Sequence, residues 1–325
     1  MSQGNHTYDA SQIKVLEGLD AVRGRPGMYI GSTGERGLHG LVLTAIDRTV
    51  NEVLAGRARS VEVTLLADGA VRVAHDGDSW TDPEDAELAV QLERLPGRWW
   101  PYDRRCVVSW FDLGLAVVNA LSDRLTVQDR KDGELRSLAY EFGRSVPAPP
   151  VAPATGAVLT FRPDPGIFPG AVLSFDTLAE RLRELAFLNR ELDLTLTGGG
   201  HSERFRSPGG LRDYLVHLYG EDQNIHAFEQ DVPAMGGTLE VAFVRTHGPD
   251  RRIRSFVNSF PTRHGTHVEG LLDGACTPHE GLTAIVSVKL DRAEFDGCRQ
   301  DFLANEPVRS AVAEAVRRHL EEAGR

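Results

Sequence analysis

Apolar residues recur at steps of three and four between Leu38 and Ala55, a spacing that predicts an amphipathic helix. Similar spacing predicts helices over Leu113–Leu121, Phe175–Leu188 and Pro307–Ala323. Short apolar or alternating runs predict strands at residues 61–66, 70–75, 125–128, 137–142, 158–161, 192–196, 238–244, 254–258 and 284–290. The first two of these strands are joined by Asp68-Gly69, which favours a tight hairpin.

Two glycine-rich segments interrupt these patterns beyond the middle of the chain. Gly198-Gly199-Gly200 and Ser207-Pro208-Gly209-Gly210 favour turns, because glycine and proline end regular elements. A chain of 325 residues has room for two domains of ~100–200 residues each. We therefore place a domain boundary at Arg206, dividing the chain into residues 1–206 and 207–325.

The charge balance is acidic, with 36 basic against 47 acidic residues and a net charge of −11. This argues against a protein that holds duplex DNA by itself, so we expect no nucleic-acid partner. No run of ~18 apolar residues is present, so we expect no membrane span or membrane partner. The three cysteines form no CxxC pair, which argues against a disulfide framework or a zinc site. We expect a cytoplasmic protein.

Several segments resemble the B subunit of DNA gyrase. They are Ile13–Arg23, Arg25-Pro26-Gly27-Met28-Tyr29-Ile30-Gly31, Val117–Ser122, Leu182–Asn189 and Glu280–Lys289. The resemblance implies an α+β fold: a GHKL (Bergerat) α/β sandwich ATPase-like domain with an N-terminal arm, followed by a shortened transducer domain similar to ribosomal S5 domain 2. In this family, arm residues that match Tyr8 and Ile13 clasp a second subunit, so the resemblance allows a homodimer.

The chain departs from the family at the residues that handle ATP. By the resemblance, the glutamate that activates water falls at Thr44 and the asparagine that binds magnesium falls at Arg48. A threonine hydroxyl is a poor general base near neutral pH, and a guanidinium repels a metal cation. The aspartate that reads adenine falls at His75. Asp76 cannot take its place, because neighbouring strand residues point to opposite faces.

Three further ATP-binding features are also changed. The glycine-rich lid aligns with residues 106–114, where Trp110 and Phe111 add bulk and Gly114 alone survives. A threonine near adenine falls at Ala157, and the transducer's glutamine and lysine fall at Cys298 and Gln300. These losses together predict a protein that has lost ATP hydrolysis and needs no cofactor and no metal.

The tryptophans are confined to a short part of the sequence. Trp80, Trp99, Trp100 and Trp110 lie within 31 residues, with Phe111 beside the last, in the segment that forms the pocket rim and lid of the family. One interpretation is that they fill the vacated cavity as core. The other is that they form aromatic walls around an apolar ligand, with a few polar anchors.

Single residues of the pocket carry alternatives as well. His75 is either a hydrogen-bonded structural histidine or a ligand contact that acts as acid or base. Arg48 either pairs internally with Glu52 or Asp78, or binds an acidic group of the ligand. We expect Thr44, Asp47, Glu52, Asp78 and Ala157 to line the pocket.

Three functions fit this sequence. The first is an enzyme that binds a hydrophobic small molecule and folds it for ring closure or isomerisation in natural-product biosynthesis, with His75 and Arg48 polarising a carbonyl. The second is a resistance protein that sequesters an inhibitor of gyrase. The third is a pseudo-ATPase that pairs with genuine gyrase and regulates it.

Overall fold

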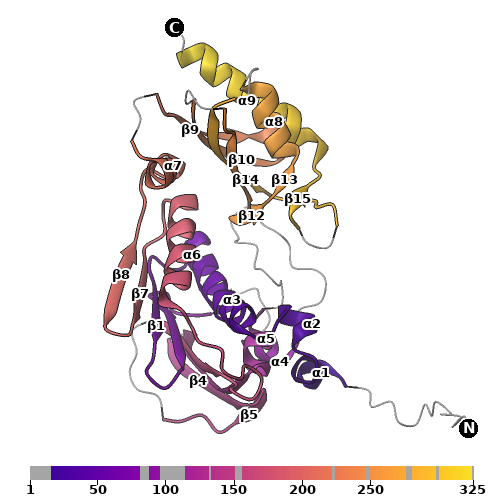
Figure 1. Cartoon of the computed structure of the whole chain (residues 1–325). Coiled ribbons are helices and arrows are strands. Elements are labelled where there is room, and N and C mark those ends of the chain that lie inside the picture. Colours follow the sequence, from indigo (N-terminus) through magenta and orange to yellow (C-terminus); the bar gives the residue numbers. More distant parts are fainter. Residues whose placement is uncertain are drawn as a thin grey trace, which may run out of the picture.

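The structure is a computed structural model that describes residues 16–80, 88–95, 114–131, 133–150, 156–221, 224–245, 249–275, 280–297 and 300–323. Within this part, helices pack on two large β-sheets that lie one beyond the other (Figure 1). The N-terminal elements belong to the first sheet and the C-terminal helix packs on the second. The chain is therefore mixed α+β.

The first sheet has eight strands in the described part of the chain, in the order β5-β4-β3-β6-β2-β1-β7-β8. All neighbouring strands are antiparallel except β1 and β7, which are parallel. The strands are β1 (Val61–Leu65), β2 (Val71–His75), β3 (Ser122–Lys131), β4 (Glu134–Glu141), β5 (Arg144–Val146), β6 (Ala157–Pro163), β7 (Leu194–Gly198) and β8 (His201–Phe205).

Helices cover one face of this sheet. The helices of this part are α1 (Gly18–Gly24), α2 (Gly27–Ile30), α3 (Glu35–Leu54), α4 (Leu88–Glu93), α5 (Gly114–Ala120) and α6 (Phe175–Leu188). Alternate strand residues such as Val61, Val63, Val71 and Val73 point into one apolar core with these helices. Helix α3 is buried over most of its length, so it forms the centre of the helical layer.

The second sheet has five strands in the described residues, in the order β12-β11-β14-β10-β9. These are β9 (His226–Val232), β10 (Gly237–Arg245), β11 (Arg252–Val257), β12 (Phe260–Thr262) and β14 (Leu282–Leu290). The other elements are α7 (Leu211–Tyr219), the 3₁₀ helix η2 (Pro233–Met235), α8 (Thr266–Gly274), α9 (Glu306–Ala323) and a small sheet of β13 (His264–Gly265) with β15 (Phe302–Leu303).

Strand β10 is buried on both of its faces. Leu239, Val241 and Phe243 join a core with α8 and α9, whereas Ala242 and Val244 join a core with α7 and the end of α6. A strand that is covered on both sides is expected to be apolar on both faces, and residues 241–244 are, whereas Glu240 is accommodated by its ion pair with Arg190. Helices α6 and α7 thus connect the two sheets.

A polar contact ties the end of α6 to the turn between β11 and β12. Arg181 donates from Nη2 to the backbone oxygen of Ser259 at 3.1 Å, and Asn189 donates from Nδ2 to Ser259 Oγ at 3.0 Å. Asn258 and Ser259 both have positive φ, of 47° and 61°, which shapes this turn. The second sheet is thereby anchored on the helical layer of the first.

Most predicted elements are confirmed, with shifts at their ends. Helix α6 has the predicted bounds, and the hairpin of β1 and β2 lies where Asp68-Gly69 placed it. The predictions missed the shorter elements, among them α1, α2, α4, α7, α8, β5, β8, β9 and β12, none of which exceeds nine residues. The boundary at Arg206 stays a prediction, although the first sheet ends at Phe205 and the second begins at His226. None of the helices in the described ranges is both long and apolar enough to cross a membrane.

Candidate functional site

The candidate site begins on one side of helix α3. Thr44, Arg48 and Glu52 follow each other at intervals of four residues, so their side chains share one helix face. Thr44 is buried, and its Oγ1 donates to the backbone oxygen of Gly40 at 2.9 Å. The Thr44 hydroxyl is therefore committed to its own helix.

Arg48 is held by a carboxylate and a backbone carbonyl. Its Nη1 donates to Glu52 Oε1 and its Nη2 to the backbone oxygen of Trp80. Arg57 binds the same carboxylate through Nε, at 2.6 Å from Oε2, and through Nη2, at 3.2 Å from Oε1. Burial opposes ionisation of Glu52, but hydrogen bonds and charge from Arg57 and Arg48 outweigh it and lower the pKa of Glu52. Glu52, rather than Asp78, is thus the partner of Arg48.

His75 is the last residue of β2 and lies beside Ala157 of β6, its register partner. Its Nδ1 accepts a hydrogen bond from the backbone N–H of Gly77 at 3.2 Å. Burial lowers the pKa of His75 to about 4, with Glu52 opposing this effect and Arg48 adding to it. The imidazole is therefore neutral at pH 7.

Trp80 closes the space beside this imidazole. Its side chain is fully buried, and its ring meets the ring of His75 edge to face, with centroids 4.9 Å apart. The backbone N–H of Trp80 lies 3.4 Å from Asp129 Oδ2. The indole of Trp80 is thus enclosed, and its Nε1 has no hydrogen-bond partner among the described residues.

The remaining predicted residues of the pocket are less closely grouped. Asp47 is buried on α3, and the charges that act on it, Arg181 and Glu184, belong to α6. Burial raises the pKa of Asp47 to about 6, with Arg181 opposing the shift and Glu184 adding to it. Asp78 is exposed, and its backbone oxygen accepts from the N–H of Arg130 at 2.7 Å.

Asp76 points away from this cluster, as the alternation along β2 predicts. Its side chain is exposed, and Oδ1 accepts from the backbone N–H groups of Arg59 at 2.7 Å and Ser60 at 3.1 Å. Trp99, Trp100, Trp110 and Phe111 lie outside the described residues, as does Cys298. In the described part of the chain, no three histidine, cysteine or acidic side chains are grouped to hold a metal ion.

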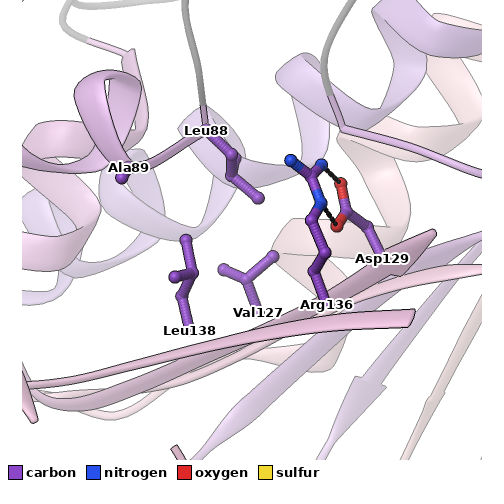
Figure 2. A pocket seen from close by; sticks show the side chains of 6 residues that line it. All are labelled: Leu88, Ala89, Val127, Asp129, Arg136 and Leu138. Atoms are coloured by element: carbon purple, nitrogen blue, oxygen red, sulfur yellow. Dashed lines mark hydrogen bonds and ion pairs between the residues drawn. The ribbon is translucent and has the colours of Figure 1, made fainter. Parts of the chain in front are cut away.

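A cavity of about 260 Å³ lies between α4 and the strands β3 and β4 (Figure 2), and its lining residue Asp129 also contacts Ser79 and the backbone of Trp80. Ser79 Oγ donates to Asp129 Oδ2 at 2.9 Å, and Arg136 donates to both oxygens of Asp129 at 3.0 and 2.6 Å. The lining residues are Leu88, Ala89, Val127, Asp129, Arg136 and Leu138.

Sequence reasoning missed two groups of this site. Arg57 follows the end of α3, and a backbone hydrogen bond from its N–H to the oxygen of Glu52, at 2.9 Å, turns it back onto the carboxylate. Asp129 and Arg136 face each other only through the register of β3 and β4. The sequence does contain a signal for the pair of Asp129 and Arg136, since these opposite charges flank a short turn.

The eight-stranded sheet with its helical layer, followed by a second α+β unit, is the architecture of the GHKL ATPase domains of type II topoisomerases. The 43K ATPase domain of Thermus thermophilus gyrase B, in complex with an aminocoumarin, superposes with a TM-score of 0.75 at 29% identity, covering 94% of this chain and 89% of that one. The ATP-binding domain of Francisella tularensis topoisomerase IV gives a TM-score of 0.75 at 26% identity over 95% of this chain and 92% of that one.

The chain is homologous to the B subunit of DNA gyrase. It is 34% identical to the protein of Clostridium acetobutylicum over 99% of its length, and 35% identical to that of Streptomyces coelicolor over 97%. A novobiocin-resistant gyrase B of Streptomyces niveus is 35% identical over 98% of this chain. The chain spans 57%, 54% and 55% of these relatives. A comparison with models of protein families finds no match.

Proposed function

We propose that this homologue of gyrase B does not hydrolyse ATP, and that its former nucleotide cleft binds a small, largely apolar molecule. The observation that carries the proposal is the position of Arg48. Where the resemblance places a magnesium ligand, a guanidinium is held between Glu52 and the carbonyl of Trp80. Without magnesium, the charge that develops on a phosphate during hydrolysis is not neutralised.

The residues present do not fit magnesium and ATP. Arg48 brings a positive charge to the metal position, and its two partners hold it there. Thr44 spends its hydroxyl on the helix backbone and offers no carboxylate to activate water. His75, at the adenine-reading position, is a neutral imidazole packed against Trp80. Each of the three changes removes a different part of the reaction.

Two features support a small organic ligand in this region. The cavity under α4 is lined by aliphatic side chains with one ion pair at its edge (Figure 2), a composition typical of ligand sites. Beside it, buried polar atoms of His75, Trp80 and Arg48 have no hydrogen-bond partner among the described residues. A site that holds a flexible substrate in a reactive pose needs no cofactor, so a cyclase or isomerase of natural-product biosynthesis is our specific proposal.

Nucleotide binding and hydrolysis test the first half of the proposal. The purified full chain should show no ATPase activity and no rise in melting temperature with magnesium and a nonhydrolysable ATP analogue. The variant Thr44→Glu/Arg48→Asn/His75→Asp restores the family's residues at three positions and serves as the matched comparison. A rise of several degrees for the unmodified chain would overturn the proposal, whatever the variant does.

A second function is favoured by the relatives. The Thermus thermophilus domain is described in complex with an aminocoumarin, and one Streptomyces niveus relative is named novobiocin-resistant. A protein that sequesters such an inhibitor would bind it tightly and release it unchanged. Titration with novobiocin, followed by chromatography of the recovered compound, separates the two functions: tight binding without product favours sequestration, and product favours the enzyme.

A further inference from the structure

Three buried nitrogen atoms at the centre of the site lack hydrogen-bond partners among the described residues. They are Nε2 of His75, Nε1 of Trp80 and Nε of Arg48. Direct contacts hold the three residues together: the rings of His75 and Trp80 meet edge to face, and Arg48 donates to the carbonyl of Trp80. Buried polar groups are nearly always paired, so a cluster of unpaired ones points to a bound partner.

The hydrogen bond from Gly77 determines which nitrogen of His75 carries the proton. A backbone N–H can only donate, so Nδ1, which it approaches at 3.2 Å, must be the unprotonated acceptor. A neutral imidazole has one proton, and that proton therefore sits on Nε2. The pKa of about 4 keeps the ring neutral at pH 7. His75 thus presents an N–H donor to the site and has no free lone pair to act as a base.

The other two nitrogens are donors in every protonation state that matters. An indole nitrogen donates only, and a guanidinium has no acceptor atom. Arg48 and Arg57 share the carboxylate of Glu52, so this carboxylate is already occupied by two guanidinium groups. Asp47 and Asn119 carry three buried acceptor atoms without partners among the described residues. The charge of Arg181 on α6 acts on Asp47, and the amide nitrogen of Asn119 donates to the backbone of Leu92 in α4.

Building on the proposed function, we propose that the ligand of this cleft presents a carbonyl or carboxylate oxygen to the N–H groups of His75, Trp80 and Arg48. His75 then acts as a neutral hydrogen-bond donor and not as an acid or a base. A ligand with an amine at the same place would bring N–H against N–H and bind more weakly. The site therefore selects for an oxygen acceptor on an apolar body.

The experiment is NMR of the full chain with ¹⁵N-labelled histidine. Without any ligand, Nδ1 of His75 should give the shift of an unprotonated nitrogen and Nε2 that of a protonated one. His39 is a built-in control with the opposite tautomer, because its Nδ1 faces the carbonyl of Glu35 at 2.7 Å and its Nε2 accepts from the N–H of Ser174 at 2.9 Å. The opposite tautomer at His75 would overturn the inference and leave the proposed function standing.

The second arm uses three one-ring probes: acetophenone, benzoate and aniline. Acetophenone and benzoate should move the Nε2–H signal of His75 and bind about tenfold more tightly than aniline, a factor expected for one gained hydrogen bond. In His75→Asp the donor becomes an acceptor, so the preference should reverse towards aniline. Acetophenone distinguishes a neutral carbonyl from the charged oxygen of benzoate.

Each remaining outcome bears on the inference. Equal binding of the three probes, or no response of His75 to any of them up to their solubility limits, would overturn it. The signal of His39 should stay unchanged throughout, since both of its ring nitrogens are occupied. A different measurement tests the proposed function: it fails if magnesium and the ATP analogue raise the melting temperature of the unmodified chain.

Discussion

Replacing Glu52 with glutamine removes the negative charge that lies between Arg48 and Arg57. The glutamine keeps the size of the side chain and can still accept a hydrogen bond, so the change isolates the charge. In the wild type, the Glu52 side chain is 0% exposed, that of Arg48 12% and that of Arg57 34%. Removal of one partner of a buried ion pair leaves the other charge uncompensated, which typically costs about 3–5 kcal/mol.

The value expected here lies at the lower end of that range. Arg57 is a third exposed, so water compensates part of its charge once the carboxylate is gone. Arg48 is nearly enclosed and its Nε has no described partner, so its charge is poorly compensated in the variant. We expect Glu52→Gln to lower the free energy of unfolding by about 3 kcal/mol at pH 7.

Urea unfolding followed by tryptophan fluorescence measures this loss, and Glu314→Gln provides the control. Glu314 pairs with Arg318 at 2.6 Å on α9, but their side chains are 69% and 51% exposed. Its replacement should change the unfolding free energy by no more than about 0.5 kcal/mol. A loss below about 1 kcal/mol for Glu52→Gln would refute the argument that this ion pair holds Arg48 in place.

The pH dependence follows from the direction of the shift. The pKa of Glu52 is lower in the folded protein than its ordinary value of 4.5. Its contribution to stability is therefore complete above pH 4.5 and is lost as the pH falls through the folded value. The difference between wild type and Glu52→Gln should shrink in that acidic range.

Three other variants test neighbouring features. Asp47→Asn should stabilise the protein. The folded pKa of Asp47, about 6, exceeds its ordinary value of 3.8, so the stability of the wild type falls as the pH rises between these two values. The gain in stability of the variant, on the order of 3 kcal/mol at most, should level off above pH 6 in melting curves. Gly77→Ala should lower the melting temperature, because its Cβ would lie 2.4 Å from the carbonyl oxygen of Arg57, whereas Gly27→Ala, with nothing within 4 Å, should not. Trp80→Ala should cost about 3–5 kcal/mol in urea unfolding if the indole fills the cavity, and a loss below about 1 kcal/mol would return it to an exposed pocket wall.

The parts of the fold that sequence reasoning predicted are those whose signal is local. Helix α6 carries its apolar stripe within 14 residues, and the hairpin of β1 and β2 is specified by Asp68-Gly69 and the runs beside it. The direction of Asp76 is predictable for the same reason, since alternation along a strand needs no knowledge of the rest of the chain.

The site was predictable in its residue types but not in its pairings. The resemblance to gyrase B predicts replacements at Thr44, Arg48 and His75, whereas the choice of Glu52 over Asp78 as the partner of Arg48 depends on where the loop after β2 runs. Asp47 lies next to Arg48 on the same helix, but the charges of Arg181 and Glu184 on α6 act on it, because a rotation of about 100° per residue turns it to another side of the helix.

The sequence by itself determined the fold of this chain, through the segments that resemble gyrase B, and the same resemblance predicts that the residues of ATP chemistry are replaced, because both depend on residue identity alone. Tertiary structure alone decided that Arg57 completes the ion pair of Glu52, that Gly77 holds one ring nitrogen of His75, and that Asp129 meets Arg136 beside a cavity. These contacts join segments that are separated along the chain, and their geometry arises only when strand register and helix packing bring the backbones together.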